Sequence, residues 1–156
     1  MTSRMATAAG TWARVALGAG FLSAVMDRLG FLGPPGRNGI TWGDVPHFLA
    51  QVATMNRFLP SSLIPPLGWT ETAIEGSLGL LLVAGLRTRA AAAASGGLLL
   101  LFALEMTFAY GLKAPLDWSV WSASAAAFLL MQHPESVLSL DNWLKAAHSS
   151  AEGSAP

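Results

Sequence analysis

The feature that most constrains this chain is an apolar run of 42 residues from Trp69 to Tyr110, interrupted once by Gly85-Leu86-Arg87-Thr88-Arg89. Residues 67–86 and 90–111 provide 20 and 22 residues on the two sides of the interruption. A helix needs about 20 apolar residues, rising about 1.5 Å each, to cross about 30 Å of hydrocarbon. The run therefore predicts two membrane-spanning helices joined by a tight basic turn.

Two further apolar segments complete the expected architecture. Residues 11–31 are longer than the apolar core of a signal peptide and lack a small-residue cleavage site, so we interpret them as a first span. Residues 116–131, rich in serine and alanine, form a fourth span. Between the first two spans, Thr41 or Asp44 can cap a short helix whose apolar residues recur at helical spacing over 45–58. The prediction is an all-α fold, a four-transmembrane-helix bundle with a short amphipathic helix in the loop between helices 1 and 2.

Composition supports a membrane protein and excludes several function classes. The chain is 53% hydrophobic and 12% charged, whereas soluble domains carry about 25% charged residues. Its formal net charge of zero argues against nucleic acid as a partner, because phosphate binding needs a concentrated basic face. With no cysteine, the chain cannot form a disulfide, a thiolate nucleophile or a thiolate-bound metal centre. We expect a single domain over residues 1–148 and a disordered tail over residues 149–156.

The short basic turn also predicts an orientation. Lys and Arg are in excess in short loops on the cytoplasmic side, and Arg87 and Arg89 lie in the shortest connection. We therefore expect a multi-pass protein of the cytoplasmic (inner) membrane, in contact with the lipid bilayer and with both termini in the cytoplasm.

Three glutamates within the predicted spans indicate a polar pocket. Glu71 and Glu75 are one helical turn apart on one face of the second span, and Glu105 lies about 9 Å below the outer end of the third. An ionisable group in hydrocarbon costs about 2.5–3.5 kcal/mol or more, so these side chains are expected to face inward. We predict that Glu75 and Glu105 are the catalytic, proton-handling pair, and that one of them is protonated or paired with Lys113, Arg28 or Arg57.

Residues from the same side of the bundle are the predicted ligand-binding set. They are His47, Glu71, Lys113, Asp117, Trp118 and Trp121. Simpler interpretations stay open: Asp27, Arg28 and Asp117 as ordinary interfacial charges, the tryptophans as an aromatic belt, and His47 as a loop residue. No pair of histidines has the helical spacing that suits haem or a metal, so no metal site is expected.

Three short motifs carry a resemblance to a known family. They are Glu75-Gly76-Ser77-Leu78-Gly79-Leu80-Leu81-Leu82, Gly85-Leu86-Arg87-Thr88-Arg89-Ala90-Ala91 and Gly111-Leu112-Lys113-Ala114-Pro115-Leu116-Asp117. With them, roughly residues 11 to 145 resemble the DoxX family of small four-helix membrane proteins, including the closing Leu138-Ser139-Leu140-Asp141. That family includes the small subunit of archaeal thiosulfate:quinone oxidoreductase and bacterial relatives tied to redox partners. The resemblance implies a four-helix transmembrane bundle in a redox system, although Glu105 departs from an expected apolar position.

Three functions are compatible with these features. The first is a membrane redox component, as a subunit of a quinone-linked oxidoreductase, which binds a quinone or similar amphiphile in an outward-facing polar pocket and exchanges protons through Glu75, Glu105 or His47. The second is a non-catalytic scaffold that anchors a soluble oxidoreductase through the loop helix and a C-terminal helix over 138–147. The third is a small-molecule or proton carrier, which four spans without an internal repeat disfavour unless a homo-oligomer forms.

Overall fold

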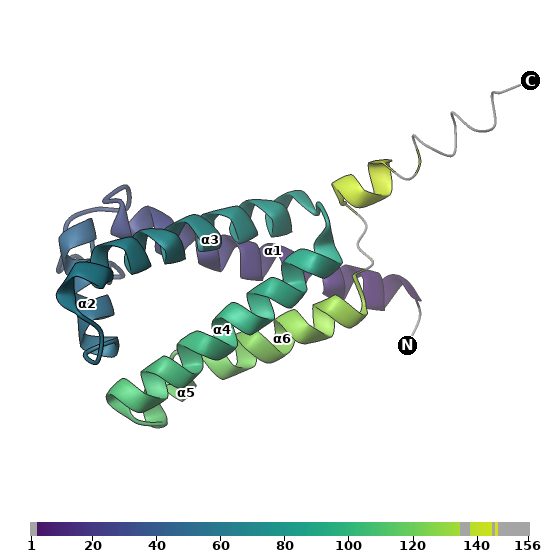
Figure 1. The fold of residues 1–156 in the computed structure, drawn as a ribbon. Helices are drawn as coiled ribbons and strands as arrows, with labels where there is room; N and C mark the ends of the chain where they lie inside the picture. The colour runs from purple at the N-terminus through teal and green to yellow at the C-terminus, as the bar shows by residue number, and fades with distance from the viewer. Residues whose placement is uncertain (1–2, 135–137, 145, 147–156) are drawn as a thin grey trace, which may run out of the picture.

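The computed structural model describes residues 3–134, 138–144 and 146, and all regular structure among them is helical (Figure 1). The elements are α1 (Ser3–Arg28), α2 (Val45–Met55), the 3-10 helix η1 (Ser61–Leu63), α3 (Ile64–Ala84), α4 (Thr88–Tyr110), α5 (Lys113–Asp117) and α6 (Val120–Gln132). The all-α prediction is confirmed. The tail predicted over residues 149–156 lies outside the described residues.

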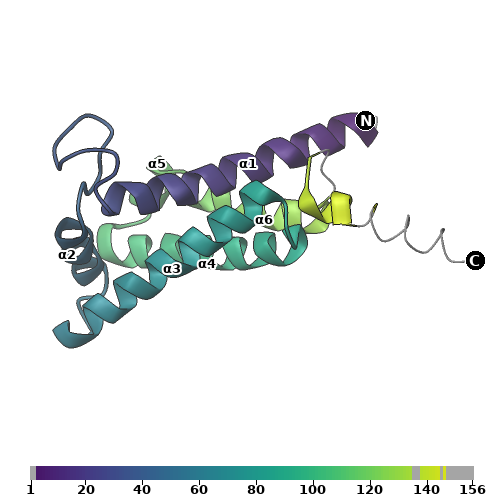
Figure 2. The same cartoon turned by 90° about the horizontal axis from the view of Figure 1, so that it is seen from above.

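The long helices form two pairs that diverge from one end of the molecule. α1 packs on α3, and α4 packs on α6. Figure 1 shows the pairs meeting near the α3–α4 turn and separating toward α2 and α5. Figure 2 shows the four helices running along a common direction, with α2 across the open end. α2, which contacts both α3 and α4, therefore lies at the end where the pairs separate.

The helix boundaries follow the predicted turn signals at most ends. Asp44 is the N-cap of α2, accepting a hydrogen bond from the backbone N–H of His47 at 2.8 Å, which settles the choice between Thr41 and Asp44. α3 ends at Gly85, whose φ of +68° is the left-handed conformation that glycine adopts without strain. The basic turn between α3 and α4 is as short as predicted.

The fourth predicted span is wrong as a continuous helix. α5 ends at Asp117 and α6 begins at Val120, because Ser119 takes a left-handed conformation with φ of +57°. By length and composition alone, two described helices are able to cross a membrane, Met5–Arg28 and Thr88–Tyr110. α3 has sufficient length but its two glutamates lower its hydropathy, and the break before α6 leaves that helix 13 residues long. The predicted count of four spans is therefore reduced to two by this criterion.

Small residues bring the helices of each pair into close contact. A methyl group added at Gly18 of α1 would lie 2.8 Å from the Val83 side chain and 2.9 Å from the Gly79 carbonyl oxygen of α3. In the other pair, the Ser124 hydroxyl donates to the Gly96 carbonyl at 2.8 Å. Such contacts are typical of helices that pack in lipid, where backbone approach replaces the hydrophobic driving force.

A buried arginine joins three segments at the closed end. The Arg14 guanidinium, 2% exposed, donates to the carbonyl oxygens of Leu82 and Leu138, and to that of Val83 at 2.7 Å. Leu82 and Val83 lie in the last turn of α3, where the backbone carbonyl groups have no partner within the helix. Arg14 therefore closes the end of α3 and holds the returning C-terminal segment against it.

The C-terminal segment also closes the start of α4. The Asp141 carboxylate accepts hydrogen bonds from the backbone N–H groups of Arg87 at 2.7 Å and Thr88 at 2.9 Å. A carboxylate at a helix N-terminus satisfies free donors and complements the helix dipole. Together with Arg14, this contact fixes the end from which the two helix pairs diverge.

Candidate functional site

A cleft of about 780 Å³ lies between the two helix pairs, with walls from α1 and α3 on one side and α4 and α6 on the other. Along α1 it extends from Asp27 to Trp12, a separation of 15 residues, or about 22 Å of helix. The part near the closed end is lined by apolar side chains such as Leu17 and Leu99. Its charged lining residues gather at the open end, and these are Asp27, Arg28, Glu71, Glu75 and Glu105.

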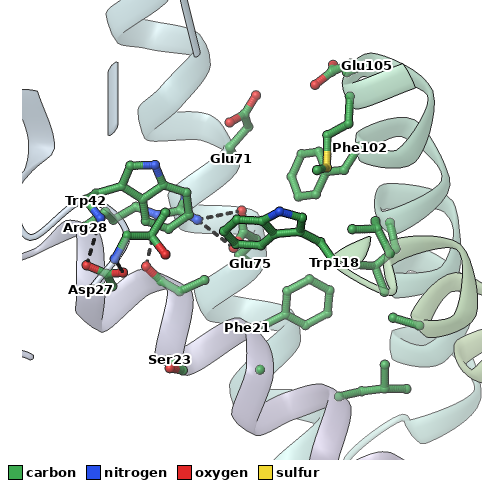
Figure 3. Close-up of a pocket in the computed structure, with 18 of the residues that line it drawn as sticks. Phe21, Ser23, Asp27, Arg28, Trp42, Glu71, Glu75, Phe102, Glu105 and Trp118 are labelled. Atoms are coloured by element: carbon green, nitrogen blue, oxygen red, sulfur yellow. Dashed lines mark hydrogen bonds and ion pairs between the residues drawn. The ribbon is translucent and has the colours of Figure 1, made fainter. Parts of the chain in front are cut away.

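A buried ion pair forms the floor of the charged end. The Arg28 Nη2 atom donates to both carboxylate oxygens of Glu75, at 3.0 and 2.9 Å (Figure 3). Arg28 is 2% exposed and Glu75 is 3% exposed. Buried charges of this kind are stable only when paired, because each alone would pay several kcal/mol of desolvation. The pair ties the end of α1 to the middle of α3.

The other two guanidinium nitrogens of Arg28 also donate. Its Nη1 donates to the Thr72 hydroxyl at 3.2 Å, and its Nε donates to the Ala24 carbonyl at 3.2 Å. The guanidinium carbon lies 4.0 Å from the ring centre of Phe48 and 4.9 Å from that of Trp42, distances at which a cation is attracted to an aromatic face. Arg28 is thus the structural centre of the open end.

Asp27 has a different role from the glutamates. Its carboxylate accepts hydrogen bonds from three successive backbone N–H groups, those of Thr41 at 2.8 Å, Trp42 at 3.2 Å and Gly43 at 2.8 Å. Gly43 has φ of +71°, and an added methyl group there would lie 2.3 Å from the Pro35 nitrogen. Asp27 therefore anchors the loop that places Trp42 over Arg28.

Glu71 and Glu105 approach the cleft from opposite walls, α3 and α4 (Figure 3). Both side chains are half-buried. Within the described part of the chain, neither accepts a hydrogen bond or forms an ion pair. Arg28 is the one cationic side chain among the described lining residues, and it is already paired. The head of the cleft therefore presents two carboxyl groups with unused hydrogen-bonding capacity.

Trp118 is one of the aromatic side chains that line the cleft at this end. It lies at the break between α5 and α6, and its ring projects toward Arg28, Glu75 and Phe21 (Figure 3). The residue is 65% exposed and lines the cleft. An aromatic face is therefore available next to the carboxyl groups.

The structure brings together half of the predicted site residues. Glu71, Glu75, Glu105 and Trp118 all line the cleft. His47 lies outside it, with Nδ1 2.7 Å from the exposed Asp44 carboxylate. Lys113 pairs with Asp117 on the exposed surface of α5. Trp121 does not line the cleft, and its indole N–H is buried without an acceptor in the described residues.

Sequence reasoning missed the functions of Asp27, Trp42 and Phe21. Asp27 was interpreted as an interfacial charge, although a carboxylate followed by a glycine-rich loop is a signal for capture of loop N–H groups. Arg28 was one of three candidate partners for Glu75, and its position within the first apolar segment favours a buried pair. Phe21 carried no signal beyond its apolar character, because its place in the cleft depends on how α1 packs.

Comparison with known proteins identifies one family. The family model described as methylamine utilisation protein MauE matches residues 5–119. No curated protein and no solved structure matches the chain. The resemblance to the DoxX family is therefore wrong, because the match is to a different family. In the structure the three motifs form part of α3, the turn from α3 into α4, and the segment that leads into and includes α5, while Asp141 of the closing segment caps α4.

Proposed function

The chain belongs to the MauE family, and from this premise we propose that it is a membrane component of a redox system for methylamine utilisation. In this proposal the cleft between the helix pairs binds a quinone or similar amphiphile. The observation that carries it is the division of one elongated cleft into an apolar part along α1 and a charged part at its open end.

The membrane arrangement follows from where the charges lie. We propose that α3 and α6 span with α1 and α4, in one domain over residues 1–148, and that the open end faces outward with both termini in the cytoplasm. Glu71 and Glu75 face the cleft rather than lipid, which removes the main objection to α3 as a span. Large apolar side chains are exposed on the four long helices, among them Trp12, Leu80, Leu101, Phe108 and Leu129. The basic turn at Arg87 and Arg89 supports the orientation.

The shape of the cleft supports an amphiphile with an extended chain. A groove about 22 Å long accommodates a hydrocarbon tail beside residues such as Ala16 and Leu17, and its charged end accommodates a polar head. Several lining residues of α1, including Gly20 and Ser23, are exposed, so the groove is open along its side. A ligand dissolved in the bilayer can therefore enter without crossing water.

The scaffold function is less well supported. The loop helix α2 directs Phe48 and Val52 into a core with Ile64 of α3, and Asp141 of the C-terminal segment caps α4. Both predicted docking surfaces thus have contacts within the chain. A soluble redox partner stays part of the proposal, and with no cysteine in the chain it would supply any dithiol or iron–sulfur electron carrier.

The test is mass spectrometry of small molecules retained through gentle purification. We expect the protein to carry an amphiphile that Ala126→Trp, which fills the cleft wall, excludes. Ala125→Trp is the matched control, since Ala125 neighbours Ala126 on α6 but is exposed and does not line the cleft. Equal retention by both variants, or co-purification of a soluble oxidoreductase without any amphiphile, would favour the scaffold function instead.

A further inference from the structure

Resting on the proposed function, we infer that the cleft selects the reduced form of its ligand, an aromatic diol of the quinol type, over the oxidised quinone. The two forms share a ring and a tail, and they differ in that the quinol carries two O–H donors where the quinone carries only carbonyl acceptors. The selection therefore depends on whether the head of the cleft offers donors or acceptors.

The head of the cleft offers mainly acceptors. The guanidinium of Arg28 is the strongest donor there, and four of its five N–H groups already donate, to Glu75, Thr72 and the Ala24 carbonyl. The indole N–H of Trp42 donates to Gln51 at 2.8 Å. The indole N–H of Trp118 has no described acceptor, and it can donate to an oxygen of either form of the ligand. The other polar groups without described partners are the carboxyl groups of Glu71 and Glu105, and an ionised carboxylate only accepts hydrogen bonds. A quinone carbonyl placed between them would meet like partial charge.

The positions of the two carboxyl groups suit a diol. Glu71 projects from α3 and Glu105 from α4, on opposite walls of the cleft. A ring between the walls can direct one hydroxyl toward each. If one carboxyl group is protonated, the quinol still pairs with both, because a hydroxyl donates and accepts. A quinone can pair only with the protonated one, so the preference holds as long as at least one of the two carboxyl groups is ionised.

Trp118 provides the contact that recognises a ring rather than an aliphatic alcohol. Its indole projects into the cleft beside the Arg28–Glu75 pair (Figure 3), and the residue is largely exposed. Offset stacking or edge-to-face contact with a second aromatic ring adds to simple burial. This contact is the same for quinol and quinone, so Trp118 sets affinity for the ring while Glu71 and Glu105 set the preference for its oxidation state.

The experiment compares one probe in two oxidation states. A benzoquinone with a ten-carbon tail, and its dithionite-reduced quinol, are bound anaerobically to the purified protein in detergent, with dissociation constants from equilibrium dialysis. We expect the quinol to bind at least tenfold more tightly. A tenfold preference corresponds to a rise of about 30 mV in the two-electron midpoint potential of the bound couple.

Variants separate this preference from a structural effect. In Glu71→Gln/Glu105→Gln the amide N–H groups donate to carbonyls, so we expect the preference to fall below about threefold or to reverse toward the quinone. Asp117→Asn is the matched control and is expected to keep the full preference, because Asp117 lies outside the cleft. Trp118→Ala is expected to raise the dissociation constants of the quinol and the quinone alike, by about threefold to tenfold.

The outcomes distinguish the two proposals. Equal binding of both forms, or tighter binding of the quinone, by the unaltered protein would overturn the selection while leaving an amphiphile-binding cleft in place. Loss of the quinol preference in Asp117→Asn would also overturn the assignment to Glu71 and Glu105. Absence of binding by either form would overturn the proposed function itself, and with it the selection.

Discussion

Removal of the Glu75 carboxylate, with Arg28 left in place, is expected to be the most destabilising single change at the site. Both side chains are almost fully buried, and one guanidinium nitrogen donates to both carboxylate oxygens at 3.0 and 2.9 Å. Breaking a buried pair from one side costs about 3–5 kcal/mol, because the other charge stays buried without its counter-charge. We expect Glu75→Leu to lower the free energy of unfolding by that amount.

Two further variants show how much of this loss comes from the unpaired charge of Arg28. Glu75→Gln keeps one oxygen acceptor for Arg28, so its cost is expected to be about 1.5–3 kcal/mol, the range for one hydrogen bond to a charged group. Arg28→Met/Glu75→Leu removes both charges together. It is expected to be less destabilising than Glu75→Leu alone, since replacing a buried pair with apolar side chains is often close to neutral.

The assay is reversible denaturant unfolding of the purified protein in detergent micelles, followed by circular dichroism. The unaltered protein, Arg28→Met, Glu75→Leu and Arg28→Met/Glu75→Leu form a double-mutant cycle. Glu71→Leu is the matched control, since it removes a carboxylate one helical turn away that has no partner among the described residues. It is expected to change stability by less than about 1 kcal/mol. A loss in Glu75→Leu no larger than the loss in Glu71→Leu would refute the reasoning.

Three other predictions concern the loop and the helix ends. Asp27→Asn is expected to speed hydrogen exchange at the amides of Thr41 and Gly43, which lose a charged acceptor; unchanged exchange would show that the loop holds without it. Asp141→Asn is expected to cost about 0.5–2 kcal/mol as a weakened cap of α4, measured by the same unfolding assay, and a neutral result would assign the cap no role. Hydrogen bonds from the backbone and side chain of His47 lower the pKa of Asp44. The stabilisation of α2 by the Asp44 cap is therefore fully present above the unfolded pKa of about 3.9, and it is lost as the pH falls through the lower pKa of the folded state. The protection factors of the α2 amides, which correct for the intrinsic exchange rate at each pH, are expected to fall below that range in the unaltered protein and to lose this pH dependence in Asp44→Asn.

Helices and their inward faces could be predicted because both are local properties. The spacing of apolar residues over 45–58 and the carboxylate of Asp44 define α2 without reference to the rest of the chain. The cost of a glutamate in hydrocarbon places Glu71, Glu75 and Glu105 on one internal surface, and all three line the cleft.

The arrangement of those groups could not be predicted, because it depends on contacts between distant segments. Glu75 had three candidate partners, and the crossing of α1 with α3 at Gly18 and Gly79 selects Arg28. The break at Ser119 has no local signal, since serine rarely adopts a left-handed conformation. That break positions Trp118 in the cleft and also shortens the helix that was expected to be the fourth span.

Photolabelling with an amphiphile that carries a diazirine at the tip of its tail tests the central claim most directly. If the head lies between Glu71 and Glu105 and the tail follows the groove, the label is expected on α1 near Trp12 and Ala16, and excess unlabelled amphiphile or Ala126→Trp is expected to abolish it. Label confined to the exposed outer surface, at residues such as Leu101 and Phe108, and insensitive to both competitor and Ala126→Trp, would contradict the account.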